Sequence, residues 1–156
     1  MSRTPGLGAE PASIAGPAPD VPLLRVAAGV LRDDAGRYLI ARRPVGAHAG
    51  GYWEFPGGKI RAGETPLAGL RRELEEELGI ELLAAEPLLT YQHRYPERIV
   101  QLEVFLVADW SGEPRGLEGQ PLQWLAGGEL LAAGLLPADL PIVEALLAGG
   151  SRASRS

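Results

Sequence analysis

The stretch GKIRAGETPLAGLRRELEEELGI, from Gly58 to Ile80, decides the fold of this 156-residue chain. It predicts a helix over Thr65 to Leu78. Thr65 can cap the helix N-terminus, Pro66 suits the first helical position, and Gly79 is a natural C-terminal stop. One apolar stripe runs along this helix and consists of Leu67, Leu70, Leu74 and Leu78. The stripe predicts that one face of the helix packs on a core.

Glutamates form another face of the predicted helix. Glu73 lies beside Glu76 and Glu77 at spacings of three and four residues, and Glu64 precedes the helix. A run such as ELEEEL is by itself typical of a solvated helix face. Hard cations such as Mg²⁺, however, bind carboxylate oxygens and share them with substrate phosphates. The run therefore leaves two interpretations open, a solvated face and a metal site for phosphate chemistry.

The composition restricts the class of protein. The chain has no cysteine, which excludes disulfides, thiolate catalysis and cysteine-ligated zinc. Its net charge of −5 argues against a general duplex-DNA binder, but it is compatible with a nucleotide whose charge a metal neutralises. No apolar run approaches the length of a membrane span. We therefore expect a cytoplasmic domain without a stable nucleic-acid or membrane partner.

The chain divides into three parts. Residues 1–22 are rich in proline, alanine and glycine and are expected to be disordered, residues 23–148 form the domain, and residues 149–156 form a second disordered tail. Strands are expected at Leu24–Leu31, Arg37–Arg42, Tyr52–Phe55, Leu82–Arg94, Ile99–Trp110 and Leu122–Leu125. Further helices are expected at Gly128–Gly134 and Leu140–Leu147. This order predicts an α/β (α+β) domain, in which helices flank a mixed sheet.

The opening stretch resembles the Nudix box, whose pattern is Gly, five residues, Glu, seven residues, Arg-Glu, an aliphatic residue, any residue, Glu-Glu, any residue, Gly and an aliphatic residue. The chain matches it with Gly58, Glu64, Arg72, Glu73, Leu74, Glu76, Glu77, Gly79 and Ile80. So many fixed spacings make the signal highly specific. The resemblance implies the Nudix fold, an α/β/α sandwich with a mixed central sheet. It also implies Mg²⁺- or Mn²⁺-dependent cleavage of a nucleoside diphosphate linkage.

The resemblance implies a set of metal ligands, namely the backbone carbonyl of Gly57 and the carboxylates of Glu73, Glu76, Glu77 and Glu118. Arg72 lies four residues before Glu76, so it can hold that carboxylate. Glu64 could orient Arg72 or help to fix the metal. One carboxylate serves as general base toward the attacking water, and Glu73 and Glu118 are both candidates. Glu118 by itself could equally be a solvated loop acid.

From Leu24 to Leu147 the chain is similar to the MutT-type branch, the 8-oxo-dGTP diphosphatases. This similarity rests on Ala41–His48, Tyr52–Ile60, Tyr95–Ile99 and Gly112–Leu125. The segment Leu135–Leu147 is more similar to the related CTP and modified-pyrimidine pyrophosphohydrolases. The resemblance implies an enzyme that cleaves 8-oxo-dGTP to the monophosphate and pyrophosphate and so cleanses the nucleotide pool. We expect a monomer or small homo-oligomer. CTP or a modified dCTP is the alternative substrate. Two further hypotheses are a nucleotide-sensing module without hydrolysis and a general diphosphate scavenger.

The resemblance also implies nucleotide contacts, which fall on Arg43, His48, Phe55, Gly57, Gly58, Tyr95, Arg98 and Asp139. Considered singly, the arginines could be exposed, the histidine structural and the tyrosine part of the core. Asp139 departs from the MutT pattern, which has asparagine here. A carboxylate only accepts hydrogen bonds. It would favour a base edge with donors, such as the cytosine amino group, the guanine N1–H and amino group, or the N7–H of 8-oxoguanine. Asp139 could instead cap the helix beginning near Pro141.

Overall fold

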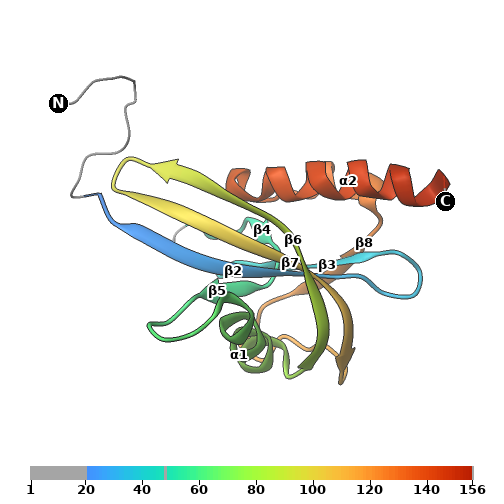
Figure 1. Cartoon of the computed structure of the whole chain (residues 1–156), viewed down its shortest axis with the longest axis horizontal. Helices are drawn as coiled ribbons and strands as arrows, with labels where there is room; N and C mark the ends of the chain where they lie inside the picture. Colours follow the sequence, from blue (N-terminus) through green and yellow to red (C-terminus); the bar gives the residue numbers. More distant parts are fainter. Residues whose placement is uncertain (1–20, 48, 156) are drawn as a thin grey trace.

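The computed structural model describes residues 21–47 and 49–155, with side chains as far as Gly149. Two sheets are present, one with strand order β5-β2-β7-β6 and one with order β4-β3-β8. Helix α1 lies on one side of the larger sheet and α2 on the other (Figure 1). Within the larger sheet β2 and β7 are parallel, whereas the other neighbours are antiparallel. The expected α/β/α sandwich with a mixed sheet is therefore confirmed.

The elements follow one another with short connections. The strands are β2 (Leu23–Leu31), β3 (Tyr38–Arg42), β4 (Trp53–Glu54), β5 (Gly57–Lys59), β6 (Glu81–Tyr95), β7 (Arg98–Ser111) and β8 (Leu122–Leu125). The helices are α1 (Pro66–Leu78) and α2 (Leu140–Arg155), and two 3₁₀ turns are η1 (Gly127–Ala132) and η2 (Pro137–Asp139). No helix among the described residues is long and apolar enough to cross a membrane.

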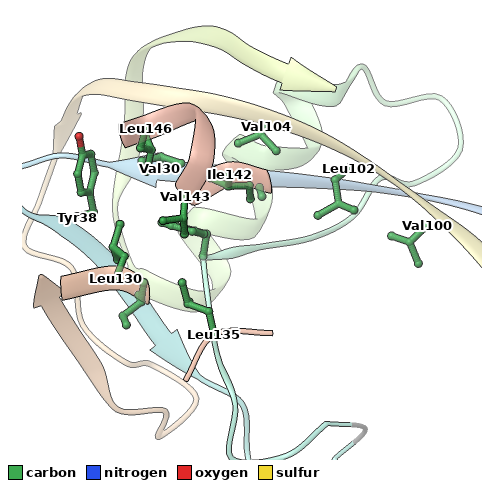
Figure 2. Packing of buried hydrophobic residues seen from close by; sticks show 13 residues of the cluster. Val30, Tyr38, Val100, Leu102, Val104, Leu130, Leu135, Ile142, Val143 and Leu146 are labelled. Carbon is green, nitrogen blue, oxygen red and sulfur yellow. The ribbon is translucent and has the colours of Figure 1, made fainter. Parts of the chain in front are cut away.

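The second half of strand β2, residues 27–31, is buried on both of its faces. Ala27 and Leu31 belong to the cluster that packs on α1, whereas Ala28 and Val30 belong to the cluster that packs on α2. Because alternate residues of a strand point to opposite faces, a strand between two helical layers is apolar at consecutive positions. This explains the apolar run from Val26 to Leu31 in β2. Figure 2 shows the second cluster, in which Ile142, Val143 and Leu146 of α2 pack among strand residues.

Helix α1 forms as its local signals predict. The Thr65 hydroxyl accepts a hydrogen bond from the Ala68 amide at 3.1 Å, and Pro66 occupies the first turn. Gly79 ends the helix in the left-handed conformation, with φ of 70°. The side chains Leu70, Leu74 and Leu78 are fully buried against the sheet. Each such burial contributes roughly 1.5–3 kcal/mol, so the apolar stripe fixes the helix and with it the glutamates.

Three expectations need correction. Gly57–Lys59 is a strand, β5, which pairs antiparallel with β2. The two strands approach so closely that a Cβ at position 57 would lie 2.0 Å from the Ala27 carbonyl oxygen, so only glycine fits there. The short helix near Gly128 is the 3₁₀ turn η1. Helix α2 continues to Arg155, past its predicted end at Leu147 and into the expected tail at residues 149–156. The other predicted tail, at residues 1–22, lies almost wholly outside the described residues.

Candidate active site

Glu73 lies directly against the backbone of strand β5. A Cβ built on Gly58 would stand 2.3 Å from the carboxyl carbon of Glu73 and 2.5 and 2.6 Å from its two oxygens. No side chain fits in that space, so Gly58 is required for α1 to approach β5 this closely. The glycine therefore lets a helix carboxylate lie against the strand backbone at the entrance to a pocket.

Arg72 holds the acidic side chains together. Its guanidinium donates to both oxygens of Glu64, at 2.7 and 3.0 Å, to Glu73 at 2.9 Å and to Glu76 at 3.4 Å. A fifth bond, of 2.9 Å, reaches the Lys59 carbonyl in β5. The predicted Arg72–Glu76 pair is thus the longest of these contacts, and the side chain of Glu76 is 47% exposed. The main partner is Glu64, so the arginine is fixed by an acid outside the helix.

The pKa values of Glu64 and Glu77 are shifted in opposite directions. Hydrogen bonds from the Arg72 guanidinium and from the Arg61 amide lower the pKa of Glu64 to about 2. Burial raises the pKa of Glu77 to about 9, and a hydrogen bond with the Glu73 carboxyl and the charges of Glu73, Glu118 and Glu54 add to the rise. Glu77 is therefore protonated at neutral pH, because burial and its acidic neighbours both disfavour the charged form.

The loop that carries Glu118 is attached to the C-terminus of α1. The Arg115 amide donates to the Leu78 carbonyl and the Leu117 amide to the Glu77 carbonyl, each at 3.0 Å. The Gln120 side chain completes the attachment: its Nε2 donates to the Glu77 carbonyl at 3.0 Å, and its Oε1 accepts from the Glu118 amide at 2.9 Å. Glu118 is exposed, but its backbone is held beside Glu77. Sequence reasoning missed Gln120.

The donor set around Glu77 fits a hard divalent cation chemically. As the side chains are placed, no group of three or more aspartates, glutamates and histidines in residues 21–47 and 49–155 could hold a metal ion. Arg72 instead binds oxygens of Glu64, Glu73 and Glu76. The donors are nevertheless all oxygens, which Mg²⁺ and Mn²⁺ prefer.

A pocket of about 300 Å³ extends from this acidic site. Gly58 and Glu77 line one part of it, and Asp139 lines another. Its apolar lining includes Val26, Ala28, Val100, Leu102 and Leu136. Its charged lining consists of Arg43, Glu54, Lys59, Glu77, Arg98 and Asp139. A ligand could therefore contact an apolar wall, several charged groups and the acidic site at once.

Asp139 is buried in the wall of this pocket. Its side chain is 5% exposed, and its Oδ2 accepts a hydrogen bond of 3.1 Å from the Phe55 amide, 84 residues away. Burial raises the pKa of Asp139 to about 7, and the charge of Glu54 contributes, whereas the Phe55 amide and Arg43 oppose the rise. The bond to Phe55 gives Asp139 a partner outside α2, which the helix-cap interpretation did not anticipate.

Arg98 carries a buried hydrogen-bond donor on the pocket wall. Its Nε is buried and has no hydrogen-bond partner among the described residues. The guanidinium lies 5.7 Å from the ring centre of Tyr95, within range of a cation–π contact. A buried donor without a partner is uncommon in proteins and costs free energy. Arg98 also lines the pocket, so this donor is available to an acceptor on a bound molecule.

The family follows from these residues together with comparison to known proteins. A NUDIX domain family model matches residues 27–145 of the chain. This chain is a Nudix hydrolase. The Nudix hydrolases generally use divalent metal ions, which agrees with the oxygen donors described above.

Similar proteins cover nearly the whole Nudix hydrolase domain. An 8-oxo-dGTP diphosphatase from Haemophilus influenzae is 41% identical over 128 residues, which are 82% of this chain and 94% of that protein. A CTP pyrophosphohydrolase from Escherichia coli is 38% identical over 126 residues, 81% of this chain and 93% of that protein. The solution structure of the Escherichia coli ORF135 protein has a TM-score of 0.75 at 38% identity, with 85% of this chain and 94% of that chain covered.

In this Nudix hydrolase most of the predicted site residues come together. The pocket is lined by the predicted contact residues Arg43, Phe55, Gly57, Gly58, Tyr95, Arg98 and Asp139, and by Glu77. Glu64, Arg72, Glu73 and Glu76 form the adjoining network, and Glu118 acts on Glu77 through its charge. His48 lies outside the described residues. The roles of these residues stay predictions, since proximity alone does not assign them.

Two charged pocket residues were missed, Glu54 and Lys59. Glu54 forms an ion pair of 3.0 Å with Arg43, and burial raises its pKa while the charge of Arg43 opposes the rise. A signal for Glu54 was present in the sequence, because it is a charged residue between the aromatic residues Trp53 and Phe55. Lys59 carried no such signal.

Proposed function

We propose that this Nudix hydrolase cleaves an oxidised purine nucleoside triphosphate such as 8-oxo-dGTP to the monophosphate and pyrophosphate, and so cleanses the nucleotide pool. The observation that carries the proposal is the single pocket lined both by residues of the Nudix box and by the buried Asp139. A triphosphate held at Gly58 and Glu77 would place its base along the apolar wall toward Asp139. Pockets for small ligands are commonly of this size and mostly apolar, with a few polar groups that select the ligand.

The proposed chemistry is hydrolysis assisted by Mg²⁺, or by Mn²⁺. Glu73, Glu76, Glu77, Glu118 and the carbonyl of Gly57 would hold the ion. When bound, it neutralises the diphosphate and lowers the pKa of a bound water. Arg72 would keep Glu73 oriented, and Glu64 would keep Arg72 in place, because each of these contacts is a charged hydrogen bond.

The proposed reaction is an in-line attack of water on the β-phosphorus, as the MutT resemblance implies. The water oxygen bonds to that phosphorus while the bond from the α–β bridging oxygen to it breaks. The nucleoside monophosphate leaves, and the water oxygen ends in pyrophosphate. Glu73 or Glu118 accepts the proton of the water. Glu73 is already oriented by Arg72, whereas Glu118 is exposed on its attached loop.

A cytidine nucleotide is the second candidate substrate. The pocket wall carries the carboxylate of Asp139 where the MutT pattern has the amide of asparagine, and this observation favours a cytidine nucleotide. A relative that matches 81% of this chain is named a CTP pyrophosphohydrolase. An ionised carboxylate accepts from the cytosine amino group as well as from donors on guanine. The proposal further includes a cytoplasmic monomer or small homo-oligomer without a stable nucleic-acid partner. The net charge of −5 supports the absence of a nucleic-acid partner.

The test compares kcat/KM for 8-oxo-dGTP, dGTP, CTP and 5-methyl-dCTP in the presence of Mg²⁺, with Glu77→Gln as the inactive control. We expect 8-oxo-dGTP to have the highest value, and hydrolysis in ¹⁸O-water to place the label in pyrophosphate. A higher value for CTP or 5-methyl-dCTP would select the second candidate. Faster cleavage of sugar nucleotides would replace both with a scavenger, and binding without hydrolysis would replace them with a sensing module.

A further inference from the structure

The segment before α2 is bonded along the end of β4. The Trp53 amide donates to the Gly134 carbonyl at 3.0 Å, and the Leu136 amide donates to the Trp53 carbonyl at 2.9 Å. These bonds flank a parallel bridge between Trp53 and Leu135. The main chain then turns away as η2, and the carboxylate of Asp139 takes the next bond in the row, from the Phe55 amide. One side of the Asp139 carboxylate is thus fixed by β4.

The other side of the same turn is held by Tyr91. This residue lies in β6, opposite Leu102 of β7, and its ring packs against the α2 cluster. Its hydroxyl donates a hydrogen bond of 2.6 Å to the carbonyl of Ala138, the residue before Asp139. Burial raises the pKa of Tyr91, so its hydroxyl remains a donor throughout the physiological range. Tyr91 itself does not line the pocket, whereas Ala138 and Asp139 do.

The Tyr91 bond therefore fixes the peptide that carries the base-selecting carboxylate. Ala138 is 6% exposed, so water has little access to replace the lost donor. Without the Tyr91 hydroxyl, η2 would keep the hydrogen bond between Asp139 and the Phe55 amide but lose the bond at Ala138. Small displacements matter here, because a polar group selects a base only while its atoms stand at hydrogen-bond distance.

We propose that Tyr91 is a positioning residue for base selection, acting through Ala138 on Asp139. This inference rests on the proposed role of Asp139 as the group that selects the base. The Tyr91 hydroxyl bonds to the turn that carries Asp139 and not to α1, so its loss should affect the affinity for the preferred base and leave the cleavage step largely as it is.

The experiment replaces Tyr91 by Phe, which keeps the ring and removes the hydroxyl. We expect the ratio of kcat/KM for 8-oxo-dGTP to that for dGTP to fall by roughly 3- to 10-fold, the range of a single lost hydrogen bond. The change should lie in KM, with kcat altered less than about twofold. The matched control is Tyr38→Phe. Tyr38 belongs to the same cluster and is 7% exposed, but it lies far from Leu102, the residue opposite Tyr91, and from Val100 (Figure 2). We expect Tyr38→Phe to leave the ratio of kcat/KM values unchanged.

A double-mutant cycle with Asp139→Ala separates the possible failures. If Tyr91 acts through Asp139, Tyr91→Phe should not change the ratio further in the Asp139→Ala protein. If Asp139→Ala changes the ratio and Tyr91→Phe does not, the role of Tyr91 is overturned while that of Asp139 stands. If Asp139→Ala itself leaves the ratio unchanged, the proposed base selection fails. An equal loss for all nucleotides, with a lower Tm, would make Tyr91 a structural residue only and overturn the inference.

Discussion

The guanidinium of Arg72 in α1 binds both oxygens of Glu64, at 2.7 and 3.0 Å, although Glu64 lies in the loop before that helix. We predict that Glu64→Gln lowers kcat/KM by about 10- to 100-fold, the effect typical of losing a group that orients metal ligands. The reason is that the amide binds Arg72 weakly and releases it from Glu73. Steady-state kinetics and the Mg²⁺ concentration at half-maximal rate measure the change.

The matched control is Glu75→Gln on the exposed side of α1. We expect it to remove the same charge without loss of rate. Equal losses in the two variants would mean that net charge, and not the contact with Arg72, determines the effect of Glu64.

The acidic site also predicts how stability depends on pH. The pKa of Glu77 rises from 4.5 in the unfolded chain to about 9 in the folded protein. Between these values the folded protein binds the extra proton, so the metal-free protein should lose stability as the pH rises from about 4.5 to about 9. Urea unfolding in EDTA at pH 5.5, 7 and 8.5 measures this slope.

Two comparisons test the cause of that slope. Glu77→Gln should flatten it and should lower the rate of hydrolysis by at least about 100-fold, as expected for a lost charge-stabilising group. Mg²⁺ should stabilise the parent protein most at the alkaline end, because ions and protons compete for the same oxygens. A slope that persists in Glu77→Gln would assign the proton to another group.

Asp139 predicts a pH-dependent choice of base, since its pKa is about 7. The ionised form accepts from N7–H, which only the oxidised guanine has, whereas the protonated form can donate to the N7 of dGTP. Discrimination of 8-oxo-dGTP over dGTP should therefore increase several-fold from pH 6 to pH 8. In Asp139→Asn the discrimination should be independent of pH over the same range. The measurement is kcat/KM for both nucleotides, with the exposed Asp109→Asn as control. A flat profile in the parent protein would exclude contact between Asp139 and N7.

We predict that catalysis depends on Gln120, a residue outside the Nudix box. Gln120→Met keeps the size of the side chain but removes the bonds to Glu77 and Glu118. We expect faster amide exchange in residues 115–120 and a fall in kcat/KM of about tenfold, because each lost bond contributes about 1 kcal/mol. Gln123→Met, on the exposed face of β8, is the control. If Glu118→Gln and Gln120→Met are additive, the two residues do not act together.

Local signals and distant contacts account for what the sequence could and could not predict. Helix α1 followed from a cap, a proline, a leucine spacing and a glycine that all lie within one segment. Strand β5 was missed because Gly57 serves to approach β2, some thirty residues earlier in the chain, and Gly58 serves to approach Glu73 of α1. Gln120 was missed for a similar reason, since its partner Glu77 is 43 residues away. The resemblance to a known family supplied Arg98 and Asp139, which no local pattern would have singled out.

The two faces of β2 have a consequence for how such an enzyme can change. Ala27 faces the helix that carries the acidic residues, and Ala28 faces the cluster beside the base pocket. In the proposed function, the residues for cleavage and the residues that select the base thus pack on opposite faces of one strand. Substitutions on the α2 side can therefore alter the substrate range while the α1 side keeps its chemistry, so that new nucleotide preferences can evolve without rebuilding the reaction.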